Sequence, residues 1–160
     1  MLLHTINTQN NLLRTDLTAI VTEPNSLDKS VYAGMRDLCK SHGGVGLAAN
    51  QAGLRENLFF LSAKLKVRKC PGGVLCLNPS WEPHIRGKKY RAEGEGCLSI
   101  PGRYFVVERW DRITARWQST SGEWVMAVLT GTAAQAFQHE HDHLRGKTLL
   151  ETSLSELQFA

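Results

Sequence analysis

The residues from Gln138 to Leu144 contain the pattern His-Glu-x-x-His, whose residue types and spacing could perform metal-assisted hydrolysis. On a helix, His139 and His143 project about 40° apart around the axis, so both imidazoles can reach one divalent cation. Glu140 then lies beside the remaining ligand, which is normally a water molecule. In that chemistry the metal acidifies the water and the glutamate accepts its proton.

The flanking sequence supplies the helix that this pattern needs. Residues 133–137 are mostly alanine and form a good helical approach, and Gly146 stands where a glycine commonly ends a helix. His141 falls on another face of the helix, so we expect it to face solvent and not to bind the metal. We therefore expect the two spaced histidines and Glu140 to share one helix face.

A catalytic metal usually takes three protein ligands, and Cys97 is the best third candidate. It lies in residues 95–102, which are bracketed by glycine and proline, so the backbone there can approach a site closely. From cysteine chemistry alone, the commoner role is that of a small buried apolar residue. Both interpretations of Cys97 stay open on this ground.

Three separated motifs make the chain similar to the peptide deformylase family. They are Gly-Val-Gly-Leu-Ala-Ala-Asn-Gln at 44–51, Glu-Gly-Cys-Leu-Ser at 95–99 and Gln-His-Glu-His-Asp-His-Leu at 138–144. They stand in the order in which the family has them, and the likeness spans roughly residues 25–150. One such motif could arise by chance, whereas three in order are hard to obtain that way.

The resemblance implies a metal centre and a base. Cys97, His139 and His143 resemble the three metal ligands, and Glu140 resembles the general acid/base. One divalent ion is implied, with Fe2+ expected and Zn2+, Ni2+ or Co2+ able to substitute. The implied substrate is the N-formyl-methionyl end of a nascent polypeptide: a hydroxide formed from the metal-bound water attacks the formyl carbon, and formate is released.

The resemblance also implies the groups around the reacting amide. Gln51 and the backbone N–H of Leu98 resemble the two donors that stabilise the developing oxyanion. Val45, Gly46 and Gly96 are expected to contact the substrate. The pocket for the methionine side chain is mostly apolar in the family.

Polar residues set two further expectations near the motifs. By register with them, Glu93 and Gln135 fall where apolar residues are common, which makes formyl chemistry a firmer expectation than strict methionine preference. Arg109 is a candidate ion-pair partner for Glu95 or Asp142, with an ordinary surface pair as the alternative.

Two rival functions remain open at this point. The His-Glu-x-x-His pattern also occurs in metallopeptidases, although their third ligand is usually histidine or glutamate and not cysteine. A catalytically silent homologue that binds RNA or the ribosome is the second rival. The presence of Gln51, Glu140 and all three ligand candidates argues against loss of activity.

Length and composition predict one domain. The 160 residues, 42% hydrophobic and 21% charged, can bury a core as a single deformylase-like catalytic domain over 1–160. No apolar run is long enough to span a bilayer, and the N-terminus lacks a secretion signal. Four cysteines without framework spacing favour free thiols in a reducing compartment, so we expect a cytoplasmic protein. They are Cys39, Cys70, Cys76 and Cys97.

The hydrophobic pattern indicates an α+β fold. A helix opens at Pro24 and ends at Gly43-Gly44, with apolar residues recurring at helical spacing. The first motif follows as a turn and a short strand, and residues 1–23 are poorly patterned. Short β-like runs are predicted at 57–61, 74–77, 104–107, 113–117 and 124–128. The resemblance implies antiparallel sheets around a central helix that carries the His-Glu-x-x-His.

The net charge of +4 is concentrated in two basic clusters. The first cluster comprises Lys64, Lys66, Arg68 and Lys69, and the second comprises Arg86, Lys88, Lys89 and Arg91. A solvated surface is the ordinary interpretation, and contact with ribosomal RNA is the functional one. We expect N-formylated nascent peptides as the substrate partner, no DNA or membrane partner, and a monomer.

Overall fold

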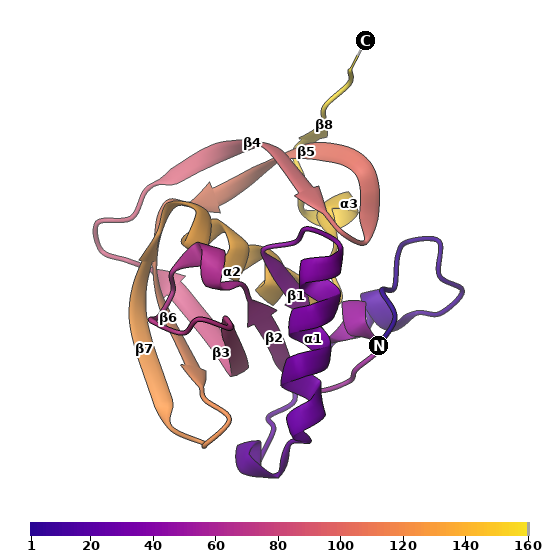
Figure 1. Ribbon diagram of the computed structural model, residues 1–160. Coiled ribbons are helices and arrows are strands. Elements are labelled where there is room, and N and C mark those ends of the chain that lie inside the picture. The colour runs from indigo at the N-terminus through magenta and orange to yellow at the C-terminus, as the bar shows by residue number, and fades with distance from the viewer. Residues whose placement is uncertain (160) are drawn as a thin grey trace.

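Two antiparallel sheets surround one helix, α2 (Gly131–Leu144), in the computed structural model, which describes residues 1–159 (Figure 1). The larger sheet has the strand order β1-β2-β3-β6-β7 and the smaller has the order β4-β5-β8. The strands of the larger sheet are β1 (Gly46–Ala48), β2 (Leu58–Leu61), β3 (Val74–Pro83), β6 (Arg112–Gln118) and β7 (Trp124–Thr130). Those of the smaller sheet are β4 (Lys89–Cys97), β5 (Ile100–Trp110) and β8 (Ser155–Glu156). The predicted α+β class is confirmed.

The N-terminal helix α1 (Lys29–Ser41) begins later than predicted. Pro24 starts a separate 3-10 turn, and Leu27 then adopts an extended conformation that interrupts the helix. The side chain of Asp28 accepts a hydrogen bond from the backbone N–H of Ser30, so the helix proper starts directly after this cap. The shorter helices are α3 (Leu149–Thr152) and the 3-10 turns η1 (Leu12–Arg14), η2 (Pro24–Ser26), η3 (Ala49–Ala52) and η4 (Ala63–Leu65).

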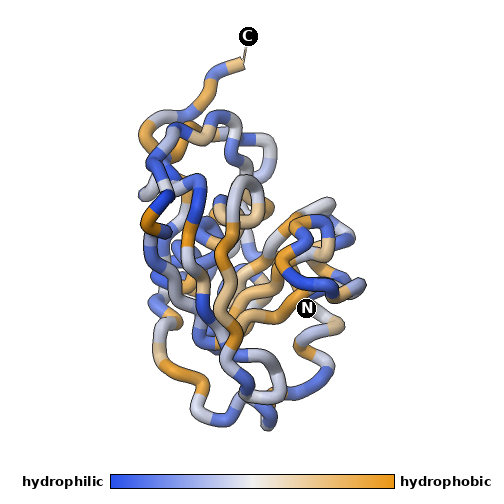
Figure 2. Tube along the Cα trace, turned by 90° about the vertical axis from the view of Figure 1, so that its left-hand side faces the viewer, coloured by the Kyte–Doolittle hydropathy of each residue, from blue (hydrophilic) through white to orange (hydrophobic). Residues whose placement is uncertain are grey.

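Helix α2 is held in the centre by aromatic packing against the larger sheet. Phe137 is fully buried, and its ring centroid lies 4.9 Å from that of Phe59 and 5.9 Å from that of Trp117. Burying a side chain of this size stabilises a fold by about 1.5–3 kcal/mol. In Figure 2 the hydrophobic segments run along neighbouring strands in the middle of the molecule, while many peripheral loops are hydrophilic. The core therefore fixes the helix that carries His139, Glu140 and His143.

The C-terminal end of α2 is set by Gly146. Its φ of +71° is the left-handed conformation that favours glycine just beyond a helix. A Cβ there would lie 2.6 Å from the carbonyl oxygen of Arg14, so the close approach of the N-terminal segment also requires glycine. The end of the helix agrees with the prediction from sequence.

Four of the five predicted strand regions lie within strands, the region 57–61 matches β2 except for Asn57, and the short strand after the first helix is present as β1. Strand β4 was not predicted. It alternates mostly exposed polar residues with a few buried ones, and a bulge between Glu93 and Glu95 places Gly94 at a φ of +80°. Because the strand has little apolar surface, its long pairing with β5 holds it in place, and that pairing is invisible in the local sequence.

Candidate active site and metal centre

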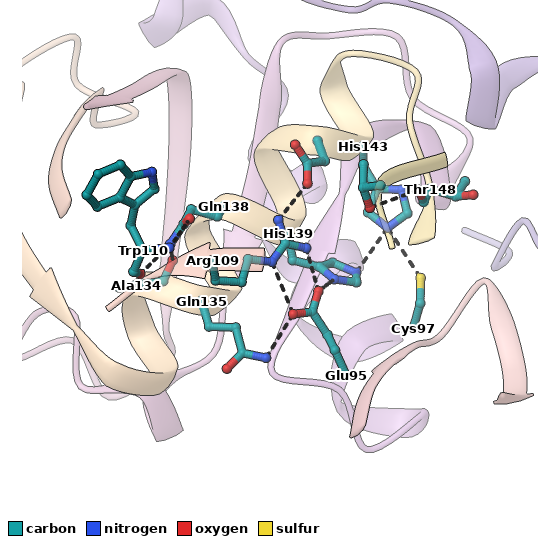
Figure 3. Close-up of polar contacts among 12 residues, drawn as sticks. Glu95, Cys97, Arg109, Trp110, Ala134, Gln135, Gln138, His139, His143 and Thr148 are labelled. Atoms are coloured by element: carbon teal, nitrogen blue, oxygen red, sulfur yellow. Dashed lines mark hydrogen bonds and ion pairs between the residues drawn. The ribbon is translucent and has the colours of Figure 1, made fainter. Parts of the chain in front are cut away.

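Helix α2 and strand β4 bring together the three side chains that were the candidate metal ligands. His139 and His143 lie one helical turn apart on α2, and Cys97 is the last residue of β4. The Nε2 atoms of the two histidines are 3.2 Å apart, and Cys97 Sγ is 3.3 Å from His143 Nε2. All three ligand atoms lie within 4.8 Å of one another (Figure 3).

The spacing of these donors fits a single cation. Ligand distances of about 2.0–2.1 Å for nitrogen and 2.3 Å for sulfur place neighbouring donors about 3.3–3.6 Å apart around a tetrahedral ion. Two imidazole nitrogens and one sulfur are also a donor set that divalent transition metals accept. Geometry and donor chemistry both fit a metal ion at this point.

The charge state of Cys97 suits the same role. Burial alone would raise the pKa of its thiol, but the facing imidazole of His143, together with that of His139, lowers this pKa well below its ordinary value. The thiolate is the form of cysteine that binds metals. This pKa shift and the contact with His143 favour the ligand role of Cys97 over that of a small buried apolar residue.

A buried ion-pair network holds His139 from behind (Figure 3). Glu95 Oε1 lies 2.6 Å from His139 Nδ1 and accepts a 2.5 Å hydrogen bond from Arg109, whose other terminal nitrogen donates to Asp142 at 2.7 Å. Gln135 donates to the second oxygen of Glu95 at 2.8 Å. Burial opposes ionisation of Glu95, but hydrogen bonds from His139 and Arg109 lower its pKa to about 2. The carboxylate thus fixes the ring so that Nε2 faces Cys97 and His143.

Arg109 forms ion pairs with both of its candidate partners, Glu95 and Asp142. Because Arg109 is only 5% exposed, these contacts are not an ordinary surface ion pair. The expectation that His141 faces solvent is wrong, because its side chain is partly buried and its Nδ1 atom is enclosed. Packing near the backbone of Pro79 covers a helix face that the pattern alone assigns to solvent.

Glu140 lies beside the three donors in a very different environment. It is 4% exposed, and its Oε2 atom is enclosed without a hydrogen-bond partner among the described residues. Burial raises the pKa of this carboxyl group to about 7, although the two imidazoles oppose the rise. Gly46 allows the close approach of β1, since a Cβ there would lie 2.5 Å from Glu140 Oε1.

Gln51 approaches the donors from a third element, η3. It is 1% exposed, its Oε1 accepts a 2.8 Å hydrogen bond from the N–H of Ala48, and its Nε2 lies 3.6 Å from Cys97 Sγ. The Nε2 atom also donates to Ser99 Oγ at 3.1 Å. Ser99 was not singled out from sequence, although it stands inside the second motif and is completely buried.

These groups open onto one cleft of about 520 Å³. The sequence-predicted residues on its wall are Val45, Gly46, Gln51, Gly96, Cys97, Leu98, His139 and Glu140. His143 is buried and is not among the lining residues, whereas Gln135 lines the cleft as expected. Glu93 is exposed and lies outside the cleft lining, so it does not make the pocket polar.

Comparison with known proteins gives a consistent result. The family described as Polypeptide deformylase matches residues 3–158. A peptide deformylase of Thermotoga petrophila is 36% identical over 140 residues, which cover 88% of this chain and 80% of that protein. The crystal structure of peptide deformylase from Thermotoga maritima has a TM-score of 0.80 at 32% identity, covering 94% of this chain and 95% of that one.

A more distant structure agrees. Peptide deformylase from Plasmodium falciparum has a TM-score of 0.81 at 28% identity and covers 94% of this chain and 85% of that chain. The match of the family over almost the whole chain confirms the resemblance seen in the three motifs. Among residues 1–159, no helix combines the length and hydrophobicity needed to span a bilayer.

The family match over residues 3–158 and the identity to the Thermotoga petrophila protein together show that the chain belongs to the polypeptide deformylase family.

Proposed function

We propose that this chain hydrolyses the formyl amide at the amino terminus of nascent polypeptides and releases formate, with Glu140, Gln51 and the Leu98 N–H as its catalytic groups. The observation that carries the proposal is the convergence of one sulfur and two imidazole nitrogens within 4.8 Å beside the buried Glu140. Membership of the deformylase family supports formyl peptides as substrates and argues against the metallopeptidase alternative.

Cys97, His139 and His143 would hold one divalent metal ion. When bound, the ion would act as a Lewis acid and lower the pKa of a water molecule towards neutrality. We propose Fe2+ as the native ion, with Zn2+, Ni2+ or Co2+ as substitutes, because a thiolate beside two imidazoles suits borderline divalent metals. Elemental analysis after anaerobic purification tests this assignment.

Glu140 is proposed to take a proton from the attacking water and return it to the leaving amine. Its carboxylate is buried at the cleft wall, so few solvent molecules compete for the proton it holds. Glu140 lines the cleft, and no hydrogen bond from residues 1–159 engages its Oε2, so none of these residues holds the proton-accepting group. General acid/base groups of this kind contribute about 100- to 10,000-fold to a rate.

Gln51 and the N–H of Leu98 are proposed to stabilise the charge that develops on the formyl oxygen. Both residues line the cleft, and they come from separate elements next to Cys97. Donors that are already oriented need no reorganisation as charge develops, and losing one typically costs about 100- to 1,000-fold in rate.

Val45, Gly46 and Gly96 are proposed to contact the substrate. They line the cleft, and Gly46 lets β1 approach Glu140 closely. The formyl carbon carries only hydrogen, so a close-fitting wall admits formyl and excludes acetyl.

The function is tested with formyl-Met-Ala-Ser and the same peptide N-acetylated. We expect formate release from the first, no reaction of the second, and no cleavage between residues. Cleavage of the chain would favour the metallopeptidase alternative. RNA binding without turnover in the Fe2+- or Co2+-loaded protein would favour the catalytically silent alternative.

Further assignments are proposed for the whole chain. We propose one catalytic domain over 1–160, which is supported by a site assembled from η3, β4 and α2. A monomer is supported because a single chain supplies every proposed catalytic group, and light scattering tests it. A cytoplasmic location is supported by the four free thiols of the described residues.

Ribosome contact is proposed through the two basic clusters, all of whose members are exposed. Lys89 is also paired with Glu108 at 2.7 Å, so the first cluster is the less neutralised one. Binding to ribosomes that weakens steeply with added salt would support this proposal. No role is proposed for DNA or a membrane.

A further inference from the structure

Ser99 is a completely buried polar residue that the proposed mechanism does not use. It lies in the tight turn between β4 and β5, directly after Cys97 and Leu98. Its hydroxyl oxygen lies 2.6 Å from the carbonyl oxygen of His4 and 3.1 Å from Gln51 Nε2. Ser99 therefore connects the N-terminal segment with a proposed catalytic side chain.

The partners of this hydroxyl determine the orientation of Gln51. A carbonyl oxygen only accepts, so the single hydroxyl hydrogen of Ser99 is donated to His4. Ser99 then offers only lone pairs to Gln51, and the carboxamide must present its NH2 group there. The other end agrees independently, because the N–H of Ala48 donates to Gln51 Oε1 at 2.8 Å.

This arrangement directs the second N–H of Gln51 towards the cleft wall. An amide NH2 carries two hydrogens, and Ser99 accepts only one of them. The nitrogen also donates a 3.6 Å hydrogen bond to Cys97 Sγ, which lies on the wall where the reacting amide would bind. Without the hydroxyl, the carboxamide would keep only its contacts to the N–H of Ala48 and to Cys97 Sγ, and it could rotate away from the cleft.

The N-terminal segment fixes both sides of this contact. The backbone N–H of His4 donates to the carbonyl oxygen of Gln51 at 2.8 Å, and the N–H of Ile6 donates to that of Ser99 at 2.9 Å. Residues 4–6, which we call the N-terminal strap, therefore join two segments that are 48 positions apart in sequence. This is a structural role for a region that showed no clear pattern.

We propose that Ser99, anchored by the N-terminal strap, is a positioning residue that holds the Gln51 carboxamide with its second N–H directed towards Cys97 at the cleft wall. The proposal rests on the donor role assigned to Gln51 under the proposed function. It adds that the orientation of this donor depends on a hydroxyl outside the reacting groups.

A double-mutant cycle tests the proposal. We expect Ser99→Ala to lower kcat about tenfold, with KM and metal content unchanged, because it removes one orienting hydrogen bond. Gln51→Ala should lower kcat about 100-fold or more. In the Gln51→Ala background, Ser99→Ala should then cost less than about twofold, because there is no carboxamide left to orient. Ser121→Ala, in the exposed turn after β6, is the matched control.

A second measurement does not depend on turnover. In zinc-loaded protein, the side-chain amide protons of Gln51, assigned by their loss in Gln51→Glu, should exchange slowly with solvent, and faster in Ser99→Ala. Unchanged kcat and exchange in Ser99→Ala, or a loss of kcat that is equally large in the Gln51→Ala background, would overturn the proposal. Normal kcat in Gln51→Ala would instead refute the donor role itself, and this inference with it.

Discussion

Two buried glutamates near the three candidate metal ligands have opposite character. Glu95 is surrounded by Arg109, His139 and Gln135, which donate to it, and its pKa is lowered to about 2. Glu140 is equally buried, but its Oε2 has no partner in the described chain, and its pKa is raised to about 7. Burial alone therefore does not decide the role of a carboxylate; its hydrogen-bond donors do.

The difference separates support from reactivity. A carboxylate with every oxygen engaged can only orient its neighbours, which is what Glu95 does for His139. A carboxylate with a free oxygen at a cleft wall can exchange a proton with a bound molecule. The following variants test this division.

Removing the Glu140 side chain should have the largest effect. We expect Glu140→Ala to lower kcat about 1,000-fold while the metal-to-protein ratio stays unchanged, because Glu140 lies beside the donors and is not one of them. Formate release and elemental analysis of the same preparation measure both quantities. Loss of the metal in this variant would contradict the assigned role.

Breaking the Glu95 network should affect stability. We expect Arg109→Met to lower the free energy of unfolding by about 3–5 kcal/mol, because it leaves Glu95 charged and buried without its main partner. Urea unfolding with a chelator present measures this without the contribution of bound metal.

The exposed pair Arg103–Glu156 provides the matched control for that variant. Arg103→Met removes the same charge from a solvent-accessible pair, so its loss of stability should be much smaller. Equal losses in the two variants would show that the Glu95 network is no more than a surface ion pair.

Replacing the sulfur donor should weaken metal retention. We expect Cys97→Ser to lose metal on dialysis against a chelator that leaves the unmodified protein loaded, because a hydroxyl is a poor ligand for this type of ion. Equal metal content in the two proteins would remove Cys97 from the ligand set.

The smallest expected effect is a difference in the alkylation rates of two free thiols, Cys39 and Cys70. Burial, together with the charge of Glu140, raises the pKa of Cys39 to about 12, and Cys39 is 1% exposed, whereas Cys70 is partly accessible. Alkylation of the metal-loaded protein at neutral pH should therefore modify Cys70 before Cys39 and leave Cys39 intact until the protein unfolds. Mass spectrometry of a time course measures this, and early modification of Cys39 would show that the Glu140 side admits water.

Sequence alone predicted the helix of the site and the identity of its candidate residues, because the spacing of His139 and His143 is a property of local helix geometry. It did not predict β4, whose exposed polar residues show no apolar alternation. It also gave no role to residues 4–6 or to Ser99, because backbone hydrogen bonds between distant segments leave no residue pattern. The environments that separate Glu95 from Glu140 likewise depend on tertiary contacts.

X-ray absorption at the edge of the bound metal tests the central claim most directly. We expect one sulfur at about 2.3 Å together with nitrogen or oxygen ligands at about 2.0–2.1 Å. The sulfur contribution should disappear in Cys97→Ser reloaded with excess metal. A spectrum of the unmodified protein that is described by nitrogen and oxygen alone would contradict the account.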